Sequence, residues 1–563
     1  MRNEAAAESG YAQLDGINRD NVATLKPAFS FHMDGASGFA GPLQTDGHTL
    51  LVLTPFPHTL YALDLDAPTP PVKWRFAPSK PNGAAEGMAF EGPINFGPAL
   101  SDGTVYFNTL DGHTIAIDAQ GGRPVWDVRM ADPAAGETLA SAPLVLHDKI
   151  IIGHAGDDFG ARGLIAALDR ATGAQLWKRY NTGPDVDVGI GDAFAPYYAT
   201  DRGRDLGTKS WPPSGWQQGG GGVAGPLSYD PATDVIFHGT GHPAPWNPEQ
   251  RPGDNKWTSG IFARGATDGA ARWFDQISPH DPYSLGGTVA NVLIDRDWRG
   301  ARRKLLVHPD ANGFVYVLDR TTGEILSATQ FGEVNAIKGI DLHTGAISRN
   351  EDKLVGDGTT RDICPGWPGA IAPGAAPAYS PDTALLYIPA SLLCMDEEAR
   401  ETGYIKGTGF VGASLRLKRA GGKSRGALIA WDVAEGKAVW TIPEDFPLAG
   451  GVLATAGGLV FYGTLDGWFK AADAKTGHVL WQYHAASGII GQPIGYTGPD
   501  GRQYVAIVAG IGGPLGMIAG NEIDRRDATA AHGASGPAAP RAARRNLVCL
   551  QSAVMVLRAR RSV

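Results

Sequence analysis

Two short segments of the chain carry side chains that could bind a metal ion. His154, Asp157 and Asp158 lie close together in the sequence, and His242 follows much later. Imidazoles and carboxylates are common ligands of zinc, iron and manganese. The alternative interpretation of His154 is a strand-end residue that faces solvent. For His242 the functional and the structural interpretations are equally supported.

The composition excludes several functional classes. The chain has 49 basic and 58 acidic residues, and its net charge of −9 argues against a nucleic-acid-binding protein. No stretch approaches the roughly 18 apolar residues that a membrane-spanning helix needs. The first residues, Met1–Ala5, lack the apolar segment of a secretory signal, so we expect a cytoplasmic chain or one whose signal has been removed. Three cysteines, Cys364, Cys394 and Cys549, are too few for a disulfide scaffold or a structural zinc set.

A repeated phrase indicates the elements that must position these side chains. The chain has 77 Gly, 40 Pro and 14 Trp, which is typical of many short strands joined by tight turns. Four complete copies of Asp-x3-Gly-x3-Trp are present, at Asp118/Gly122/Trp126, Asp169/Gly173/Trp177, Asp432/Gly436/Trp440 and Asp473/Gly477/Trp481. Weaker copies lie at Asp66/Trp74, Gly269/Trp273, Asp319/Gly323 and Asp341/Gly345.

Each copy of the phrase has a local physical meaning. It follows an apolar strand such as Leu164–Leu168, Asp and Gly then form a turn, and the Trp begins the return strand. Trp74, Trp126 and Trp177 are about 50 residues apart, which matches one four-stranded propeller blade. We therefore predict an all-β fold, a single closed propeller whose Trp residues are wedged between neighbouring blades.

A run of four glycines, Gly219–Gly222, is not a phosphate-binding loop. It lacks the Lys-Ser/Thr pair of a P-loop and the strand–helix setting of a dinucleotide-binding turn. We interpret it as a loop whose backbone lies close to a neighbouring blade or to a ligand.

Further motifs resemble a known family, the PQQ-dependent methanol/ethanol dehydrogenases. They are the long run Trp246–Trp257, the segment Thr54–Pro57 before Leu60–Asp64, and Gly463–Gly467. The resemblance extends from about Tyr11 to Asp527. It implies an eight-bladed propeller whose axis holds pyrroloquinoline quinone (PQQ) and one calcium or lanthanide ion. It also implies oxidation of a primary alcohol to an aldehyde, with electrons passed to a cytochrome c.

The resemblance assigns two metal-binding positions to this chain. Asp158 corresponds to the family's metal-binding Glu, which lies in a Gly-x-Glu-x-Gly-x-Arg-Gly run. Asp158 keeps a carboxylate, a hard oxygen ligand, on a side chain that is one methylene shorter. The family's metal-binding Asn corresponds to His242, in the run Gly241–Asn247. An imidazole suits zinc or iron better than calcium.

The family's catalytic and cofactor-contacting positions are substituted. Ser284 takes the place of the catalytic base, and Gly286 that of an additional lanthanide-binding Asp. Asp281, three residues before Ser284, is a candidate substitute base. The remaining positions are Ala311 for the quinone-contacting Arg, Ala224 for the Trp below the quinone, Phe90 and Glu91 for the adjacent cysteine pair above it, and Phe39 for a cofactor-contacting Glu.

Three hypotheses about function follow. The first is a divergent quinoprotein oxidoreductase with PQQ and calcium or a lanthanide, with Asp158 as metal ligand, Asp281 as base, and a small alcohol and a cytochrome c as partners. The second is a propeller that has lost the chemistry and serves as a scaffold or binding protein, with no cofactor. The third is a propeller with zinc, iron or manganese held by His154, Asp157, Asp158 and His242.

The resemblance also bears on the cysteines and the compartment. The family has a disulfide in the context of Cys364 and Cys394, and closing a loop of that length is worth about 3–4 kcal/mol. The alternative is two buried thiols. A disulfide predicts an oxidising compartment, so we expect the family's periplasmic location, although the chain carries no signal.

The end of the chain departs from the family. We predict a propeller over residues 11–531 and a divergent basic tail over 532–563. Residues 541–563 contain six Arg and no acidic residue. A shifted reading frame or a basic interaction tail would explain this composition. Within it, Ala553–Leu557 is apolar enough to imitate the strand that closes the last blade.

Overall fold

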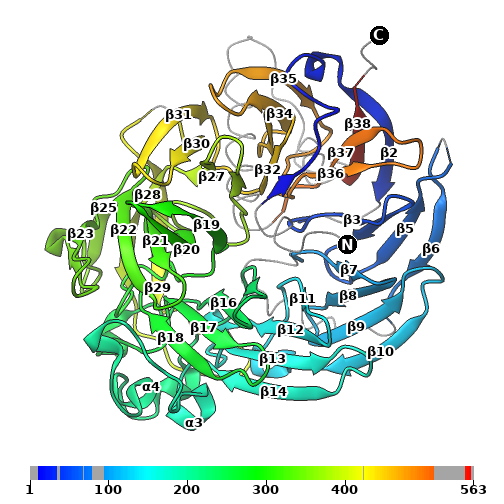
Figure 1. Cartoon of the computed structure of the whole chain (residues 1–563). Helices are drawn as coiled ribbons and strands as arrows, with labels where there is room; N and C mark the ends of the chain where they lie inside the picture. The colour runs from blue at the N-terminus through cyan, green and yellow to red at the C-terminus, as the bar shows by residue number, and fades with distance from the viewer. Residues whose placement is uncertain are drawn as a thin grey trace, which may run out of the picture.

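The computed structural model describes residues 10–33, 38–67, 69–78, 94–422, 424–512 and 552–559. Within these residues the strands form eight blades around one axis (Figure 1). In each blade, antiparallel neighbours run from an inner strand near the axis to an outer strand at the rim. The predicted all-β, eight-bladed propeller is therefore confirmed.

The first four blades follow one another along the chain. Blade 1 contains β3 (Gln44–Thr45), β4 (Thr49–Leu53), β5 (Leu60–Asp64) and β6 (Val72–Phe76). Blade 2 contains β7 (Ala99–Ser101), β8 (Thr104–Asn108), β9 (His113–Asp118) and β10 (Pro124–Arg129). Blade 3 contains β11 (Leu144–Val145), β12 (Lys149–His154), β13 (Leu164–Asp169) and β14 (Gln175–Tyr180). Blade 4 contains β15 (Ser228–Asp230), β16 (Val235–Gly239), β17 (Ile261–Gly265) and β18 (Ala271–Asp275).

The next three blades complete most of the ring. Blade 5 contains β19 (Val292–Trp298), β20 (Ala301–Pro309), β21 (Phe314–Asp319) and β22 (Glu324–Gln330). Blade 6 contains β26 (Ala378–Ser380), β27 (Leu385–Ser391), β30 (Gly426–Asp432) and β31 (Lys437–Glu444). Blade 7 contains β32 (Val452–Thr455), β33 (Leu459–Gly463), β34 (Trp468–Asp473) and β35 (Val479–His484), and β1 (Tyr11–Ala12) is paired parallel to β32.

Blade 8 closes the ring with strands from both ends of the described chain. Its order is β36 (Ile494–Thr497), β37 (Gln503–Ala509), β38 (Ser552–Arg558) and β2 (Lys26–Met33). The apolar segment Ala553–Leu557 thus lies in β38, between β37 and the N-terminal strand β2. The predicted boundary between residues 531 and 532 lies outside the described residues.

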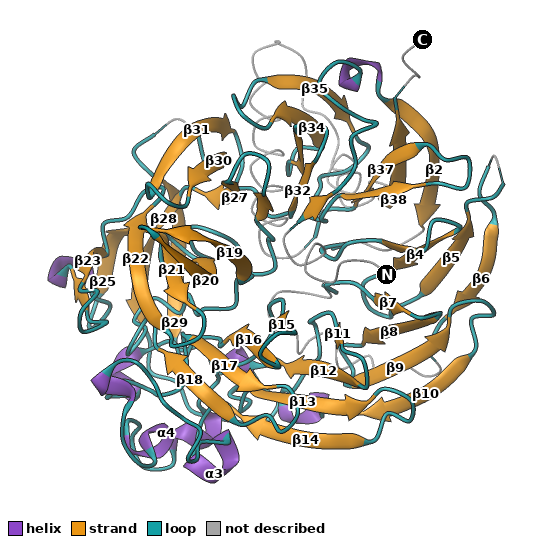
Figure 2. Cartoon of the chain, in the orientation of Figure 1, coloured by secondary structure: helices purple, strands orange, loops and turns teal. Residues whose placement is uncertain are grey.

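Several elements lie outside the blades. Strands β25 (Thr359–Ile363), β28 (Leu393–Ala399) and β29 (Ala413–Arg419) form a separate sheet, called here the accessory sheet. Strands β23 (Ile337–Ile340) and β24 (Ile347–Arg349) form a hairpin. Two short helices, α3 (Asp185–Val188) and α4 (Leu206–Lys209), lie at the outside of the ring (Figure 2). No helix in the described ranges is long and apolar enough to cross a membrane.

The repeated tryptophans lie between neighbouring blades, as the sequence predicts. The indole N–H of Trp126 donates to the carbonyl of Arg170 in the next blade, at 3.1 Å. Five more tryptophans make the same contact with the following blade, namely Trp74 with Ala119, Trp177 with Ala266, Trp273 with Arg320, Trp440 with Ala474 and Trp481 with Leu25. The repeated Gly lies over the indole of the preceding blade, because a Cβ on Gly173 would come within 2.8 Å of Trp126.

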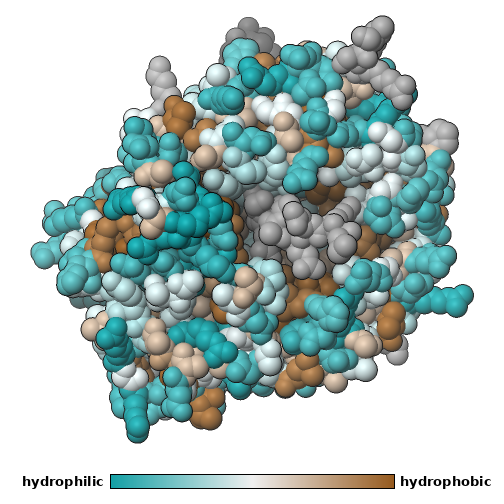
Figure 3. All heavy atoms as spheres, in the orientation of Figure 1, coloured by the Kyte–Doolittle hydropathy of each residue, from teal (hydrophilic) through white to brown (hydrophobic). Residues whose placement is uncertain are grey.

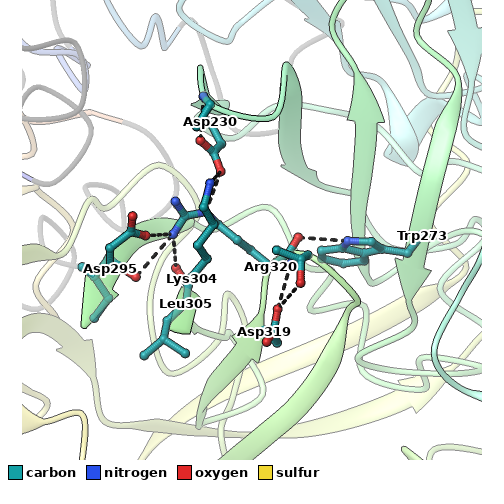
Figure 4. A network of polar contacts seen from close by, with 10 residues as sticks. Asp230, Trp273, Asp295, Lys304, Leu305, Asp319 and Arg320 are labelled. Atoms are coloured by element: carbon teal, nitrogen blue, oxygen red, sulfur yellow. Dashed lines mark hydrogen bonds and ion pairs between the residues drawn. The ribbon is translucent and has the colours of Figure 1, made fainter. Parts of the chain in front are cut away.

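Blades 4 and 5 share an additional polar network (Figure 4). Arg320 is only 7% exposed and bonds Asp230 of blade 4 at 3.0 Å and Asp295 of its own blade at 2.5 Å. Lys304 also bonds Asp230, at 3.2 Å. The side chain of Arg320 therefore joins the two blades at the position where its carbonyl accepts the bond from Trp273.

The predicted disulfide between Cys364 and Cys394 is confirmed. It ties Cys364, directly after β25, to Cys394, the second residue of β28, within the accessory sheet. Both cysteines are buried, and Ala420 packs beside them.

Candidate functional site

A cavity of about 90 Å³ lies near the axis, between the loops of several blades. Its polar lining comprises Thr138, Asp157, Asp158, His242, Ser284 and Thr288. Its apolar lining includes Ile94, Phe96, Leu110, Phe159, Ala224, Leu285, Trp367, Pro368 and Pro373. Hydrophilic residues cover most of the rim of the molecule, and hydrophobic residues show around the centre of the ring (Figure 3).

The carboxylate of Asp158 is held by two neighbours. The indole N–H of Trp246 donates to Asp158 Oδ1 at 2.7 Å, and Nε2 of His242 lies 3.4 Å from the same oxygen. Burial alone would lower the pKa of His242, but the carboxylates of Asp158 and Asp157 overcome this effect and raise that pKa to about 9. The imidazole of His242 is therefore a cation that neutralises Asp158.

The carboxylate of Asp157 lies in a cradle of glycine backbone. The N–H of Gly222 donates to Asp157 Oδ1 at 2.6 Å. A Cβ on Gly241 would collide with the same carboxylate. Burial raises the pKa of Asp157 to about 6, and the nearby imidazole of His242 opposes that rise. The glycine run Gly219–Gly222 thus lies close to a neighbouring loop and to a buried acid.

His154 is not brought to the cavity. Its side chain is fully buried, so it does not face solvent, and its Nε2 lies 3.4 Å from Glu137 Oε2. The three residues Asp157, Asp158 and His242 do meet at the cavity. The structure therefore brings together three of the four side chains that the third hypothesis requires.

The carboxylate of Asp281 also lies away from the cavity. It accepts hydrogen bonds from the Ser259 hydroxyl at 2.9 Å and from the backbone N–H groups of Tyr283, Leu285 and Gly286 at 3.0–3.1 Å. Asp281 thereby folds its own loop and directs Ser284 and Gly286 toward the cavity. The Ser284 hydroxyl is buried and has no hydrogen-bond partner in the described structure.

The other predicted cofactor positions are dispersed. Ala224 lines the cavity, whereas Ala311 packs in an apolar cluster with Tyr283 and Leu285. Phe39 is buried in the core of blades 1 and 8 and is bridged to Asn95. Phe90 and Glu91 lie outside the described residues.

The sequence did not predict the roles of two residues near the cavity. Trp246 and Arg251 were recognised only as part of a family motif. Arg251 is 1% exposed and donates to the carbonyls of Pro245, Trp246 and Asp281. Arg251 therefore joins the loop that holds Asp158 to the loop that carries Ser284. The feature that could have indicated the role of Arg251 is its position as a basic residue within a run rich in Pro and Gly.

Comparison with known proteins decides the family. The family model of the glucose/ethanol/alcohol dehydrogenase β-propeller domain, of the PQQ type, matches residues 2–338 and 429–505. The chain belongs to this family. It is 41% identical to the lanthanide-dependent methanol dehydrogenase of Methylacidiphilum fumariolicum, over 96% of this chain and 88% of that protein.

Further relatives agree with this assignment. Subunit 1 of the methanol dehydrogenase [cytochrome c] of Methylobacterium organophilum is 41% identical over 94% of this chain and 86% of its own length. The structure of a europium-containing methanol dehydrogenase superposes with a TM-score of 0.91 at 39% identity, and covers 99% of this chain and 96% of that one.

The described residues of the cavity offer few of the donors that the family's metal and cofactor need. Among the described residues, no three His, Cys, Asp or Glu side chains form a metal-binding group. Asp158 is already bonded by Trp246 and neutralised by His242. PQQ carries several carboxylates, and the described residues that line the cavity include no Lys or Arg to pair with them. The described residues that line the cavity are therefore a poor fit to the metal–quinone pair.

Proposed function

We propose that this member of the quinoprotein dehydrogenase family binds a small organic molecule in its axial cavity and does not oxidise it with PQQ. The observation that carries the proposal is the pairing of Asp158 with Trp246 and His242. This pairing satisfies the acid from within the protein, so its charge does not require a metal ion. The carboxylate of Asp281 accepts hydrogen bonds from the backbone of its own loop, so it is not available as a catalytic base.

The lining of the cavity indicates the class of ligand. Apolar walls from Leu110, Phe159 and Trp367 lie around the Ser284 hydroxyl, which is buried and has no partner in the described structure. A buried hydroxyl without a partner costs free energy unless a ligand or water bonds it. A small, mostly apolar molecule with one hydrogen-bonding group, such as a short-chain alcohol, satisfies Ser284 and fills the cavity.

Reconstitution tests the proposal. The purified chain is incubated with PQQ and either calcium or lanthanum and then desalted. We expect no quinone absorbance in the protein fraction and no dye-linked oxidation of methanol or ethanol. Quinone retention in stoichiometric amount together with alcohol-dependent dye reduction would refute the proposal.

A second candidate is the family's own activity, PQQ-dependent oxidation of a primary alcohol with electrons passed to a cytochrome c. The observation that favours it is identity of about 40% to methanol dehydrogenases along nearly the whole chain. The same reconstitution separates the two candidates. The disulfide between Cys364 and Cys394 favours an oxidising compartment, and we extend the proposal to a periplasmic location for either candidate.

The transition-metal hypothesis has its own measurement. Asp157, Asp158 and His242 supply two carboxylates and one imidazole, and His154 stands apart with Glu137. Elemental analysis of the purified chain and of the variant His242→Ala tests it. Zinc, iron or manganese near one equivalent in the natural chain, lost in the variant, would favour a metal site over a metal-free cavity.

A further inference from the structure

A buried glutamate lies in the central strand of the accessory sheet. Glu397 of β28 is 1% exposed and is paired in register with Thr360 of β25 and Leu415 of β29. Met395, two residues earlier and therefore on the same face of the strand, packs in one apolar cluster with Tyr283 and Leu285. Glu397 thus faces the loop that carries Ser284.

Neither carboxyl oxygen of Glu397 has a hydrogen-bond partner in the described structure. The hydroxyl of Tyr283 and the Nε of Arg349 are also buried and without a partner there. An ionised carboxylate in such a place is costly, because burial removes water and nothing replaces it. The neutral acid is the form that this environment favours.

Glu397 interacts with Arg251, Asp281 and Tyr283, and Arg349 interacts in turn with Arg251 and Tyr283. Burial raises the pKa of Glu397 to about 8, Asp281 adds to the rise, and Arg251 opposes it. The pKa of Tyr283 is raised as well, chiefly by burial, so this phenol stays neutral near pH 8. Glu397 is therefore the member of the cluster whose charge changes in mildly alkaline solution.

Arg251 connects this cluster to the axial cavity. Its guanidinium donates to the carbonyls of Pro245 and Trp246 on one loop and to that of Asp281 on the other. The first loop holds Asp158 through the indole of Trp246, and the second presents Ser284 and Gly286 to the cavity. A new negative charge beside Arg251 would compete with these backbone carbonyls for its N–H groups.

We infer that Glu397 is a pH-operated switch for the axial cavity. While neutral, it leaves Arg251 bonded to both loops. When it ionises, it draws Arg251 away and repels Asp281, so that the loop 281–286 loosens at the cavity. This switch acts on the protein scaffold and does not depend on which ligand or cofactor the cavity takes.

The neighbouring glutamate provides a matched control. Glu398 follows Glu397 on β28, points to the other face of the strand, and forms an ion pair with Arg400 at 3.0 Å near the surface. The variants Glu397→Gln and Glu398→Gln remove one carboxylate each from adjacent positions of one strand. Glutamine at position 397 keeps the shape of the neutral acid.

Two measurements test the inference on the full chain. Infrared spectroscopy between pH 6 and 9 follows the carbonyl band of a protonated carboxylic acid, and hydrogen exchange follows the protection of residues 281–286, corrected for intrinsic exchange. Other buried acids such as Asp275 contribute to the same band, so we expect one component of it to disappear with a midpoint near pH 8 in the natural chain and in Glu398→Gln. Protection should fall by up to about tenfold per pH unit above that midpoint.

In Glu397→Gln we expect the component of the band that titrates near pH 8 to be missing and the protection of 281–286 to be independent of pH. An unchanged protection of this loop in the natural chain across pH 6–9 would overturn the inference, whatever the variants do. Loss of protection in Glu397→Gln equal to that in the natural chain would overturn it as well, because the loosening would then come from another group.

Discussion

At the scale of single residues, the polar side chains near the axis are bonded to one another, because Asp158 contacts both Trp246 and His242. The resemblance predicts that His242 corresponds to the family's metal-binding Asn, and its Nε2 lies 3.4 Å from Asp158 Oδ1. Asp157 is satisfied by the backbone of Gly222, which only a loop without side chains brings so close. The carboxylates of Asp157 and Asp158 are therefore bonded by the protein itself, whereas the buried hydroxyl of Ser284 has no partner in the described structure.

A glycine substitution tests the close approach at Asp157. In Gly241→Ala the new Cβ would collide with the Asp157 carboxylate, so loops must shift. We expect the free energy of unfolding to fall by about 1–3 kcal/mol, as for other overpacked sites. Chemical denaturation measures it. Gly191→Ala is the control, because nothing lies within 4 Å of a Cβ there, and it should change stability by less than about 0.5 kcal/mol. Equal effects in both variants would contradict the prediction.

Two buried histidines predict a loss of stability in acid. Burial lowers the pKa of His58 to about 4 and that of His238 to about 3. Each therefore binds a proton in the unfolded chain, near pH 6.5, before it does so in the folded chain. Stability is complete above about pH 6.5 and decreases as the pH falls toward 4, by at most about 1.4 kcal/mol per pH unit for each histidine.

The variant His58→Gln isolates one of these contributions. Denaturant unfolding between pH 7 and pH 4.5 should show a smaller decrease in the variant than in the natural chain. His478→Gln, at an exposed position, should retain the full decrease. A pH dependence that is the same in all three proteins would show that His58 does not titrate on unfolding as expected.

At the scale of elements, neighbouring blades are joined by one repeated contact, between the indole of one blade and a turn of the next. The Trp of one blade donates to a carbonyl of the next blade, and a glycine there leaves room for the indole ring. Blade 5 departs from the pattern, because Ser327 occupies the Trp position of β22 and Gly436 of the next blade approaches Thr329 instead. The network of Arg320 lies at the junction of blades 4 and 5, on the other side of blade 5 (Figure 4).

Removal of Arg320 tests the strength of this junction. Arg320→Met leaves Asp230, which is 4% exposed, with only Lys304 as a charged partner. We expect stability to decrease by about 3 kcal/mol, since breaking a buried ion pair leaves a charge uncompensated. Thermal or denaturant unfolding measures the loss. The control Lys437→Met breaks an exposed pair with Glu435 and should cost less than about 0.5 kcal/mol. A loss as small as the control's would mean that the Trp contact alone holds the blades together.

At the scale of the whole molecule, both ends of the described chain meet in one blade. Strand β38 pairs with β37 on one side and with the N-terminal strand β2 on the other. Val554, Met555, Val556 and Leu557 of β38 are all buried. A blade that lacked this strand would separate β2 from β37 and expose two strand edges.

Deletion of residues 552–563 tests ring closure. It removes four buried apolar side chains, worth about 6–12 kcal/mol of burial, which is comparable with the entire stability of an ordinary protein. We therefore expect the shortened chain to aggregate or to lose its cooperative unfolding transition. Deletion of residues 560–563 leaves β38 whole and should preserve both solubility and the transition. A soluble, cooperatively folded chain without β38 would contradict this account of closure.

Much of the architecture could be predicted from local sequence. Asp-x3-Gly-x3-Trp encodes a turn, a return strand and a contact with the next blade within nine residues, so its repetition specifies a ring. The pairing of Cys364 with Cys394 was likewise predicted, from resemblance. The resemblance pointed to Asp158, His242 and Ser284, with Asp157 as a neighbouring candidate, and the structure brings all four to the lining of one cavity.

The sequence by itself therefore determined the repeating blade, the closed ring and the loops that supply the axial residues. Only the tertiary structure decided where each polar side chain is bonded. The carboxylate of Asp281 accepts hydrogen bonds within its own loop, and the imidazole of His154 lies next to Glu137. The buried Glu397 lies beside Arg251. The physical reason is range: turns and strand pairing depend on neighbours in sequence, whereas these partners come from loops far apart in the chain that meet only when the ring closes.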